Sequence, residues 1–186
     1  VQQNGYAMAY ADLTLRNDRR FVSAAISRDC RALEYANTKL QNDRWLVLLA
    51  VAQNGQALKF VNWMYRNDSG IVLEAVKQSV DSLKFASRRL KNDRNFILEV
   101  VRIDGDALEF VSDEMRKDRE VVLAAVKNKM QSLQYASDEI DQYEILVDAK
   151  LVDRDGHEDS FTKKTIFDSA FATLLDENPF LSTFFC

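Results

Sequence analysis

The apolar residues of this chain recur at helical spacing, and the pattern repeats along the sequence. In segment 118–128, DREVVLAAVKN, four apolar positions fall at i, i+1, i+4 and i+5, on one stripe of a helix: Val121, Val122, Ala125 and Val126. Segment 132–140, SLQYASDEI, has a second stripe at i, i+3 and i+7. No segment alternates with period two, and the chain has one proline, Pro179. The pattern predicts helices and no strands.

A period of 25 residues runs through most of the chain. Five aspartates are spaced by this interval: Asp18, Asp43, Asp68, Asp93 and Asp118. Thirteen residues after each of them begins a segment of one type: RALEYA (31–36), QALKFV (56–61), DSLKFA (81–86), DALEFV (106–111) and QSLQYA (131–136). These positions define copies one to five, which begin at the five aspartates, and a half copy over 1–17.

Each copy is expected to form two helices joined by a turn. The aspartate is placed to cap the first helix, because its carboxylate can accept hydrogen bonds from the free N–H groups there. Helices of about ten residues are only marginally stable alone in water, so they must pack on their neighbours. Residues 1–142 are therefore predicted to form an all-α, solenoid-like array of 25-residue helix-turn-helix repeats.

Three glycines follow a longer period of 50 residues, and they are Gly5, Gly55 and Gly105. The copies between them have Cys30, Val80 and Met130 at this position. Glycine after Asn or Asp suits a left-handed residue that ends a helix, where valine would be strained. Two interpretations remain open: alternate copies use different turns, or the turn is not left-handed.

The repeat resembles a known family. Tandem copies of the pattern (N)DRxxVLxAVxxNGxALxYA are similar to the family described as domain of unknown function 4116 (DUF4116), over residues 1 to about 142. The resemblance implies an all-helical tandem array, often within a larger chain. It implies no catalytic activity and assigns no functional residues.

Residues 143–186 depart from the period. Segment 143–152, YEILVDAKLV, is interpreted as a degenerate half repeat that has lost its aspartate and forms a helix on the last copy. After a polar turn, Ile166 to Leu175 form an amphipathic pattern that Pro179 follows. This Phe-rich segment is predicted to be a helical cap of the array. The alternative is a docking tail that inserts Phe180, Phe184 and Phe185 into a partner.

Composition narrows the classes of function. Apolar residues make up 47% of the chain and charged residues 29%, which suits a folded protein. A net charge of −4 argues against a protein built around phosphate binding, so no nucleic-acid partner is expected. No apolar run approaches the roughly 20 residues of a transmembrane helix. The chain opens on Val1 without a visible signal peptide, which is compatible with processing or with a piece of a longer chain.

The two cysteines, Cys30 and Cys186, lie far apart in unrelated contexts. Reduced thiols in an intracellular or organellar reducing compartment are the simpler interpretation. One weak candidate metal site, DRDGHED, contains Asp153, Asp155 and Asp159, but it lacks a full calcium-loop pattern and equally suits an exposed loop. The sequence has no phosphate-binding glycine loop, CxxC pair or HExxH motif. It predicts no enzyme and no cofactor.

Four arginines share the 25-residue period, and they are Arg19, Arg44, Arg94 and Arg119. In an array they would form a row that could bind phosphates. Each follows an aspartate, however, and Ser69 interrupts the series. Ion pairs between copies are the favoured interpretation, and nucleic-acid binding is the alternative.

Copy two departs from the repeat at four positions: Trp45, Leu49, Trp63 and Met64. The equivalent positions in other copies are mostly polar or charged, so they are expected to face solvent. Exposed Trp, Leu and Met are typical of a protein-binding surface. The alternatives are that copy two buries these residues by different packing, or that the C-terminal tail folds onto them.

The sequence therefore predicts a non-catalytic module that binds another protein or protein complex, as a scaffold or as a subunit of an assembly. Two alternatives stay open. One is a nucleic-acid-binding repeat protein that uses the arginine row. The other is an accessory region of a longer enzyme chain.

Overall fold

The computed structural model describes residues 5–151, and every regular element in that range is a helix. The prediction of an all-α repeat array is confirmed. The chain divides into two compact units, Val1–Phe96 and Ile97–Cys186. The elements are η1 (Gly5–Tyr10), α1 (Leu13–Arg16), α2 (Arg19–Ile26), η2 (Cys30–Tyr35), α3 (Thr38–Gln41), α4 (Arg44–Gln53), η3 (Gly55–Phe60), α5 (Trp63–Arg66), α6 (Ser69–Gln78), η4 (Val80–Phe85), α7 (Arg88–Lys91), α8 (Arg94–Ile103), η5 (Gly105–Phe110), α9 (Asp113–Lys117), α10 (Arg119–Asn128), η6 (Met130–Tyr135) and α11 (Gln142–Asp148), where η marks a 3-10 helix.

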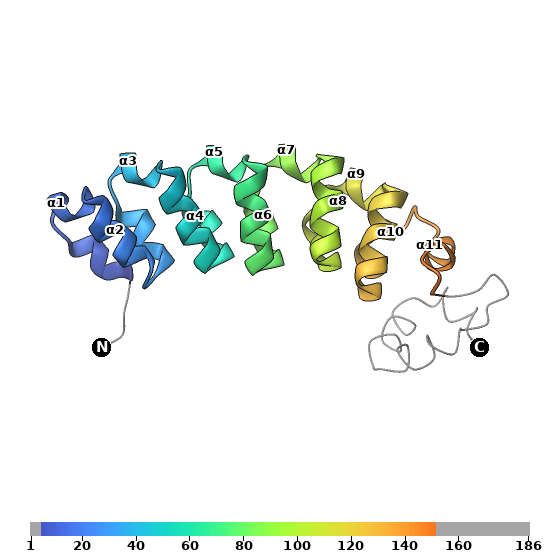
Figure 1. Ribbon diagram of the computed structural model, residues 1–186. Coiled ribbons are helices and arrows are strands. Elements are labelled where there is room, and N and C mark those ends of the chain that lie inside the picture. Colours follow the sequence, from blue (N-terminus) through green and yellow to red (C-terminus); the bar gives the residue numbers. More distant parts are fainter. Residues whose placement is uncertain (1–4, 152–186) are drawn as a thin grey trace. The chain divides into compact units, whose positions relative to one another are not determined.

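Each of copies one to four contains three helical segments: a long α-helix, a six-residue 3-10 helix and a short α-helix. Copy five has no short α-helix between η6 and α11. In the first unit, α2, α4 and α6 pack in order, and η1 to η4 form a second row that packs on them. The short helices lie at the end of this stack where the long helices begin (Figure 1). In the second unit, α10 packs on η5, η6 and α11.

The core consists of apolar residues at repeated positions. Each 3-10 helix from η2 to η6 contributes one leucine that is at most 1% exposed, and these are Leu33, Leu58, Leu83, Leu108 and Leu133. The long helices contribute fully buried valines such as Val47, Val72 and Val122. Burying one such side chain contributes about 1.5–3 kcal/mol, more than helix propensity supplies per residue. Packing between copies therefore holds the short helices in place.

The second predicted helix of each copy, 132–140 in copy five, is not one helix. The 3-10 helix ends, and two residues with extended backbone precede the short α-helix. In copy one these residues are Ala36 and Asn37, with ψ of 163° and 145°. The Asn37 side chain then caps α3 by accepting from Lys39 N–H. In copy five, Leu133 lies in η6, Ala136 directly follows it, and Ile140 lies in the turn before α11. The i, i+3, i+7 spacing thus came from a 3-10 helix and the turn that follows it.

A long polar side chain at the end of each short helix reaches back to the preceding 3-10 helix. Gln41 Nε2 donates to Glu34 O at 2.6 Å, and Arg66 Nη2 donates to Lys59 O at 2.6 Å. The same bond to the residue seven positions earlier is made by Arg16, Lys91 and Arg116. Because the last carbonyls of a helix lack partners within it, these side chains act as caps.

The glycines are explained by close packing. Neither Gly55 nor Gly105 has a positive φ, so the turn is not left-handed. A Cβ at Gly55 would lie 2.2 Å from Ala75 O and 2.4 Å from Ser82 Oγ, and one at Gly105 would meet the equivalent atoms of copy five. The neighbouring helix therefore approaches too closely for any side chain at these positions.

Segment 143–152 was predicted as a helix without its aspartate, and both its boundaries and its cap need correction. The helix α11 begins at Gln142, and Asp141 caps it by accepting from Glu144 N–H. The aspartate is thus present, two residues before its place in the period. The helix ends at Asp148, shortly before Lys150, whose φ is 61°. Ile145 and Leu146 are buried as α11 packs on α10.

The packing at Gly55 gives a stability prediction. Gly55→Ala should lower the free energy of unfolding by about 1–3 kcal/mol, because the new Cβ meets a backbone carbonyl that cannot move independently. Urea unfolding measures this change. Gly70→Ala is the matched control, because its Cβ would meet Asp68 Oδ1 at 3.4 Å and Arg44 Nη2 at 3.8 Å. This control should be neutral or stabilising by up to about 1 kcal/mol. Equal stability of the two variants would contradict the packing account.

Candidate interaction surface

The four candidate residues of copy two lie on two helices. Trp45 and Leu49 belong to α4, and Trp63 and Met64 open α5. Trp63 is 72% exposed, Trp45 51% and Met64 47%, while Leu49 is half-buried. Within the described residues, the packing of copy two therefore does not bury the tryptophans. We call these four residues the copy-two surface.

Hydrogen bonds hold together the starts of α4 and α5. Asn62, directly before Trp63, donates through Nδ2 to Asn42 Oδ1 at 3.1 Å. Asn42 ends α3 and stands three residues before Trp45. Tyr65 OH also donates to the Asn42 carbonyl oxygen. Trp45 and Trp63 thus each follow within three residues a side chain of the hydrogen-bonded contact between copies one and two.

The ring of Trp45 contacts a positively charged side chain. The Arg19 guanidinium lies 4.8 Å from the centroid of its indole ring. The same guanidinium donates through Nε to Asp43 Oδ2 at 2.7 Å. The other oxygen, Asp43 Oδ1, accepts from Trp45 N–H at 2.9 Å and caps α4. The Asp43 carboxylate therefore caps α4 and also holds the Arg19 guanidinium over the Trp45 ring.

The arginine row forms ion pairs between copies, as the sequence favoured. Arg19 pairs with Asp43, and Arg44 pairs with Asp68. Arg119 pairs with Asp148 of α11 at 2.6 Å. Arg94 is the first residue of α8. Each pair joins the first turn of one long helix to an aspartate of the helix that packs next to it, so the charges of Arg19, Arg44 and Arg119 are locally neutralised.

These contacts change the acidity of the aspartates. The hydrogen bond from Arg19 lowers the pKa of Asp43, with smaller contributions from backbone N–H groups. For Asp68, burial raises the pKa, but the bonds from Arg44 and Ile71 N–H outweigh it and leave the pKa lowered. Both carboxylates are therefore charged in the folded protein at neutral pH.

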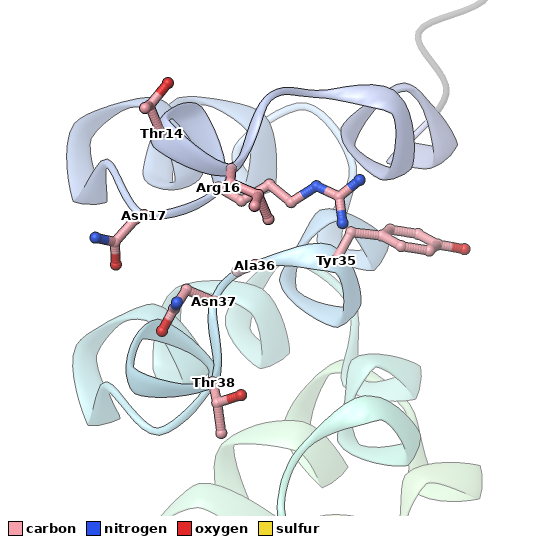
Figure 2. A pocket seen from close by; sticks show the side chains of 8 residues that line it. Thr14, Arg16, Asn17, Tyr35, Ala36, Asn37 and Thr38 are labelled. Carbon is pink, nitrogen blue, oxygen red and sulfur yellow. The ribbon is translucent and has the colours of Figure 1, made fainter.

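A groove lies where the half copy meets copy one. It has a volume of about 440 Å³ and is lined by residues of α1 and of the η2–α3 junction: Leu13, Thr14, Arg16, Asn17, Tyr35, Ala36, Asn37 and Thr38 (Figure 2). At the next two junctions, Asn42 and Asn67 bind side chains of the following copy. In the described range, no such side-chain bond to the following copy reaches Asn17, so the groove stays open.

No sequence feature predicts this groove, because Asn17 has the same place in its copy as Asn42 and Asn67. The three positions differ only in the side chains that the following copy supplies to bind the asparagine. Copy two supplies Asn62 and Tyr65, and copy three supplies Ser87 and Arg89, which donates to Asn67 Oδ1 at 2.8 Å.

Several predicted candidates lie outside the described residues. They are the weak metal candidates Asp153, Asp155 and Asp159 and the tail residues Phe180, Phe184 and Phe185. Within 5–151, no group of three potential ligands is placed to hold a metal ion.

Cys30 is a free, buried thiol whose pKa is raised by burial. No helix in the described range has the length and apolarity to span a membrane.

Comparison with known proteins identifies the repeat. The family model described as "Domain of unknown function (DUF4116)" matches residues 1–40, 19–66, 68–116 and 93–141. These overlapping matches cover most of the chain, so the chain belongs to this family, as the resemblance predicted. No curated protein matches it, and neither does any solved structure.

The lowered pKa of Asp43 predicts a pH-dependent stability. A lowered folded-state pKa contributes stability above the unfolded value of about 4, and this contribution is lost as the pH falls through the folded value. Asp43→Asn keeps an oxygen for the helix cap but removes the charge that binds Arg19. It should cost about 0.5–1 kcal/mol at neutral pH and almost nothing near pH 2. Urea unfolding at both pH values checks this, and a deficit that persists undiminished at low pH would contradict it.

Proposed function

We propose that this member of the DUF4116 family is a non-catalytic module that binds another protein through the copy-two surface, as a scaffold or as a subunit of an assembly. One observation carries the proposal. Copy two exposes two tryptophans and a methionine at positions where the other copies have mainly polar or charged side chains. Stability of the repeat does not require apolar residues there, because the other copies fold without them.

The chemistry of the surface supports protein binding. Trp63 and Trp45 together present a large apolar area, and tryptophan is the residue type most often found at the energetic centre of protein interfaces. Met64 adds a flexible side chain that adapts to different partner shapes. Since Asn62 and Tyr65 fix α5 against Asn42, the anchors are already positioned before a partner arrives. A surface that is held in place loses less conformational entropy on binding.

Nucleic-acid binding remains a hypothesis that the contacts make less favourable. The guanidinium groups of Arg19 and Arg44 are bound to Asp43 and Asp68, so a phosphate would have to displace a carboxylate from each. The net charge of −4 also repels a polyanion. The role of an accessory region in a longer enzyme chain is compatible with the proposed binding surface.

A double substitution in α5 tests the proposal with little structural cost. In copy four, helix α9 has Asp113 and Glu114 at the equivalent positions. Trp63→Asp with Met64→Glu therefore introduces residues that another copy already has. Acidic residues in the first turn favour a helix, so stability should change by less than about 1 kcal/mol. Loss of two anchors should weaken partner binding at least about 30-fold, which corresponds to 2 kcal/mol.

The partner is first identified by quantitative affinity capture with the wild-type chain, and binding of the purified partner is then measured by titration. The chain has only two tryptophans, both in the copy-two surface, so their fluorescence reports binding directly. Ile103→Ala is the control, because Ile103 is an exposed apolar residue outside the surface. Equal binding of the α5 variant and the wild type would refute the proposal. A steep fall of affinity with salt, abolished by Arg44→Gln, would support the nucleic-acid alternative instead.

A further inference from the structure

The charge of the chain changes sign along the sequence. Residues 1–96 contain 15 lysines and arginines against 9 aspartates and glutamates, which is a net charge of +6. Residues 97–186 contain 10 against 20, which is a net charge of −10. The change of sign coincides with the boundary between the two compact units. The copy-two surface therefore belongs to the basic unit of an acidic protein.

The positions equivalent to Trp63 and Met64 show this change most clearly. These two residues open α5, and the equivalent pair in each of the other full copies is polar and exposed. In chain order these pairs are Thr38 with Lys39, Arg88 with Arg89, Asp113 with Glu114, and Asp138 with Glu139. The apolar pair of copy two is thus followed and preceded by basic residues, and the acidic pairs belong to the second unit.

Hydrogen bonds place α5 between α3 and α7. Asn62, which caps α5, binds the side chain of Asn42 at the end of α3. Asn67 at the end of α5 accepts from Ser87 Oγ at 2.6 Å, and Ser87 caps α7. The three short helices follow one another along the same end of the first unit (Figure 1). The basic side chains of α3 and α7 therefore flank Trp63.

The cations beside the copy-two surface are bonded to neutral oxygens. Arg66 and Arg89 each donate two hydrogen bonds of 2.6–3.1 Å, to main-chain carbonyl oxygens and to the Asn67 side chain. These bonds position the guanidinium groups without cancelling their charge. In the described range, no carboxylate is paired with either arginine, nor with Lys39 or Arg88. The positive charge of all four side chains is therefore available to a ligand.

Trp45 has similar surroundings. One period before it, in the first turn of α2, the equivalent residue is Arg20, which is exposed. Helix α2 packs directly on α4, the helix of Trp45. In later copies the equivalent residues are Gly70, Asn95 and Glu120. Both tryptophans thus lie in basic surroundings, although the whole chain is acidic.

We infer that the partner segment bound by the copy-two surface is acidic, with two or more aspartates or glutamates around a large apolar side chain. This inference rests on the proposed function and adds the chemistry of the partner. The apolar side chain covers Trp63 and Met64, and the carboxylates bind Lys39, Arg88 and Arg89. Because the apolar contact excludes water beside these ion pairs, the pairs are stronger than they would be on an open surface.

A second copy of this chain supplies the charge without the apolar group. Its acidic pairs belong to the second unit, at positions 113–114 and 138–139. Within the described residues of that unit, the one large apolar side chain that is exposed is Ile103, at 39%. It lies at the end of α8, outside the short helices. The acidic pairs therefore have no apolar side chain to place on Trp63.

A nucleic acid supplies negative charge and bases that can stack on tryptophan. Residues 97–186, however, carry a net charge of −10, which repels a long polyanion. A short acidic segment needs only the cations next to Trp63, because charges farther away than about 8 Å are screened at physiological salt. The charge distribution therefore favours the acidic polypeptide.

The probe is a capped synthetic peptide with four aspartates around one leucine and one phenylalanine, and without tryptophan. It is titrated into the full chain, whose two tryptophans report binding by their fluorescence. We expect saturable binding with a dissociation constant of about 0.1–1 mM, because a short flexible peptide is ordered as it binds. Asparagine in place of the four aspartates should weaken binding about three- to tenfold. Serine in place of leucine and phenylalanine should abolish it.

The variant Lys39→Gln with Arg88→Gln tests the cations. Both side chains are exposed and make no hydrogen bond within the described range, so the fold should be unchanged. The variant should bind the aspartate peptide about three- to tenfold more weakly, and the asparagine peptide like the wild type. Arg102→Gln with Lys127→Gln is the matched control, because it removes the same charge from exposed positions of α8 and α10. This control should bind both peptides like the wild type.

The same variants are measured with the partner that affinity capture identifies, which separates this inference from the proposed function. A partner that is lost with Trp63→Asp and Met64→Glu, but binds Lys39→Gln with Arg88→Gln like the wild type, overturns the acidic segment and leaves the proposed function standing. A partner that binds both variants like the wild type refutes the proposed function itself.

Three further results would overturn the inference. The first is the absence of any fluorescence change at several millimolar aspartate peptide. The second is a single-stranded oligouridine that competes with the peptide and binds more tightly than it does at physiological salt. The third is self-association of the chain in sedimentation velocity that Lys39→Gln with Arg88→Gln abolishes, because the occupant would then be a second copy.

Discussion

The structure depends on one constraint: its helices are too short to be stable alone. The long helices have eight to ten residues and the short ones four or five, and isolated helices of this length are largely unfolded in water. Each copy is therefore ordered only by the neighbour on which it packs. The valines and leucines that recur every 25 residues provide this contact, and the aspartate that begins each long helix aligns it. By capping its own helix and binding the preceding arginine, Asp43 couples local order to stacking.

This constraint also determines which residues are available for recognition of a partner. Arg19, Arg44 and Arg119 of the arginine row form ion pairs with the following copy or helix, so they add little free charge to the surface. The residues available for recognition are those that stacking does not use. Trp63 and Met64 are such residues, because α5 is held by Asn62 and Tyr65 and not by its exposed side chains.

The sequence predicted the parts of this fold that follow from periodicity. The 25-residue period, the capping aspartates and the pairing of Arg19 and Arg44 with the next copy all follow from residue spacing. The division of the second helix did not, because Leu133, Ala136 and Ile140 have the same spacing on one helix as on the 3-10 helix η6 and the turn that follows it. The hydrogen bonds that Gln41 and Arg66 donate to the preceding 3-10 helix could not be predicted, because such polar side chains usually face solvent. For Gly55 the sequence left two interpretations open, and the structure has no left-handed turn there. The glycine is required by Ala75 O of the following helix, a contact between residues 20 positions apart. Trp45 and Trp63 could be singled out because they break a pattern, but only the structure relates them, through Asn42.

The central claim is that copy two presents its tryptophans to solvent for a partner to bind. Acrylamide quenching of the fluorescence of the full chain tests this most directly, because both tryptophans of the protein lie in this surface. The account predicts emission typical of solvated indole and quenching close to that of a free tryptophan derivative, slightly reduced by Arg19 over the Trp45 ring. Blue-shifted emission and strong protection from acrylamide in the isolated chain would contradict it, since the surface would then already be covered.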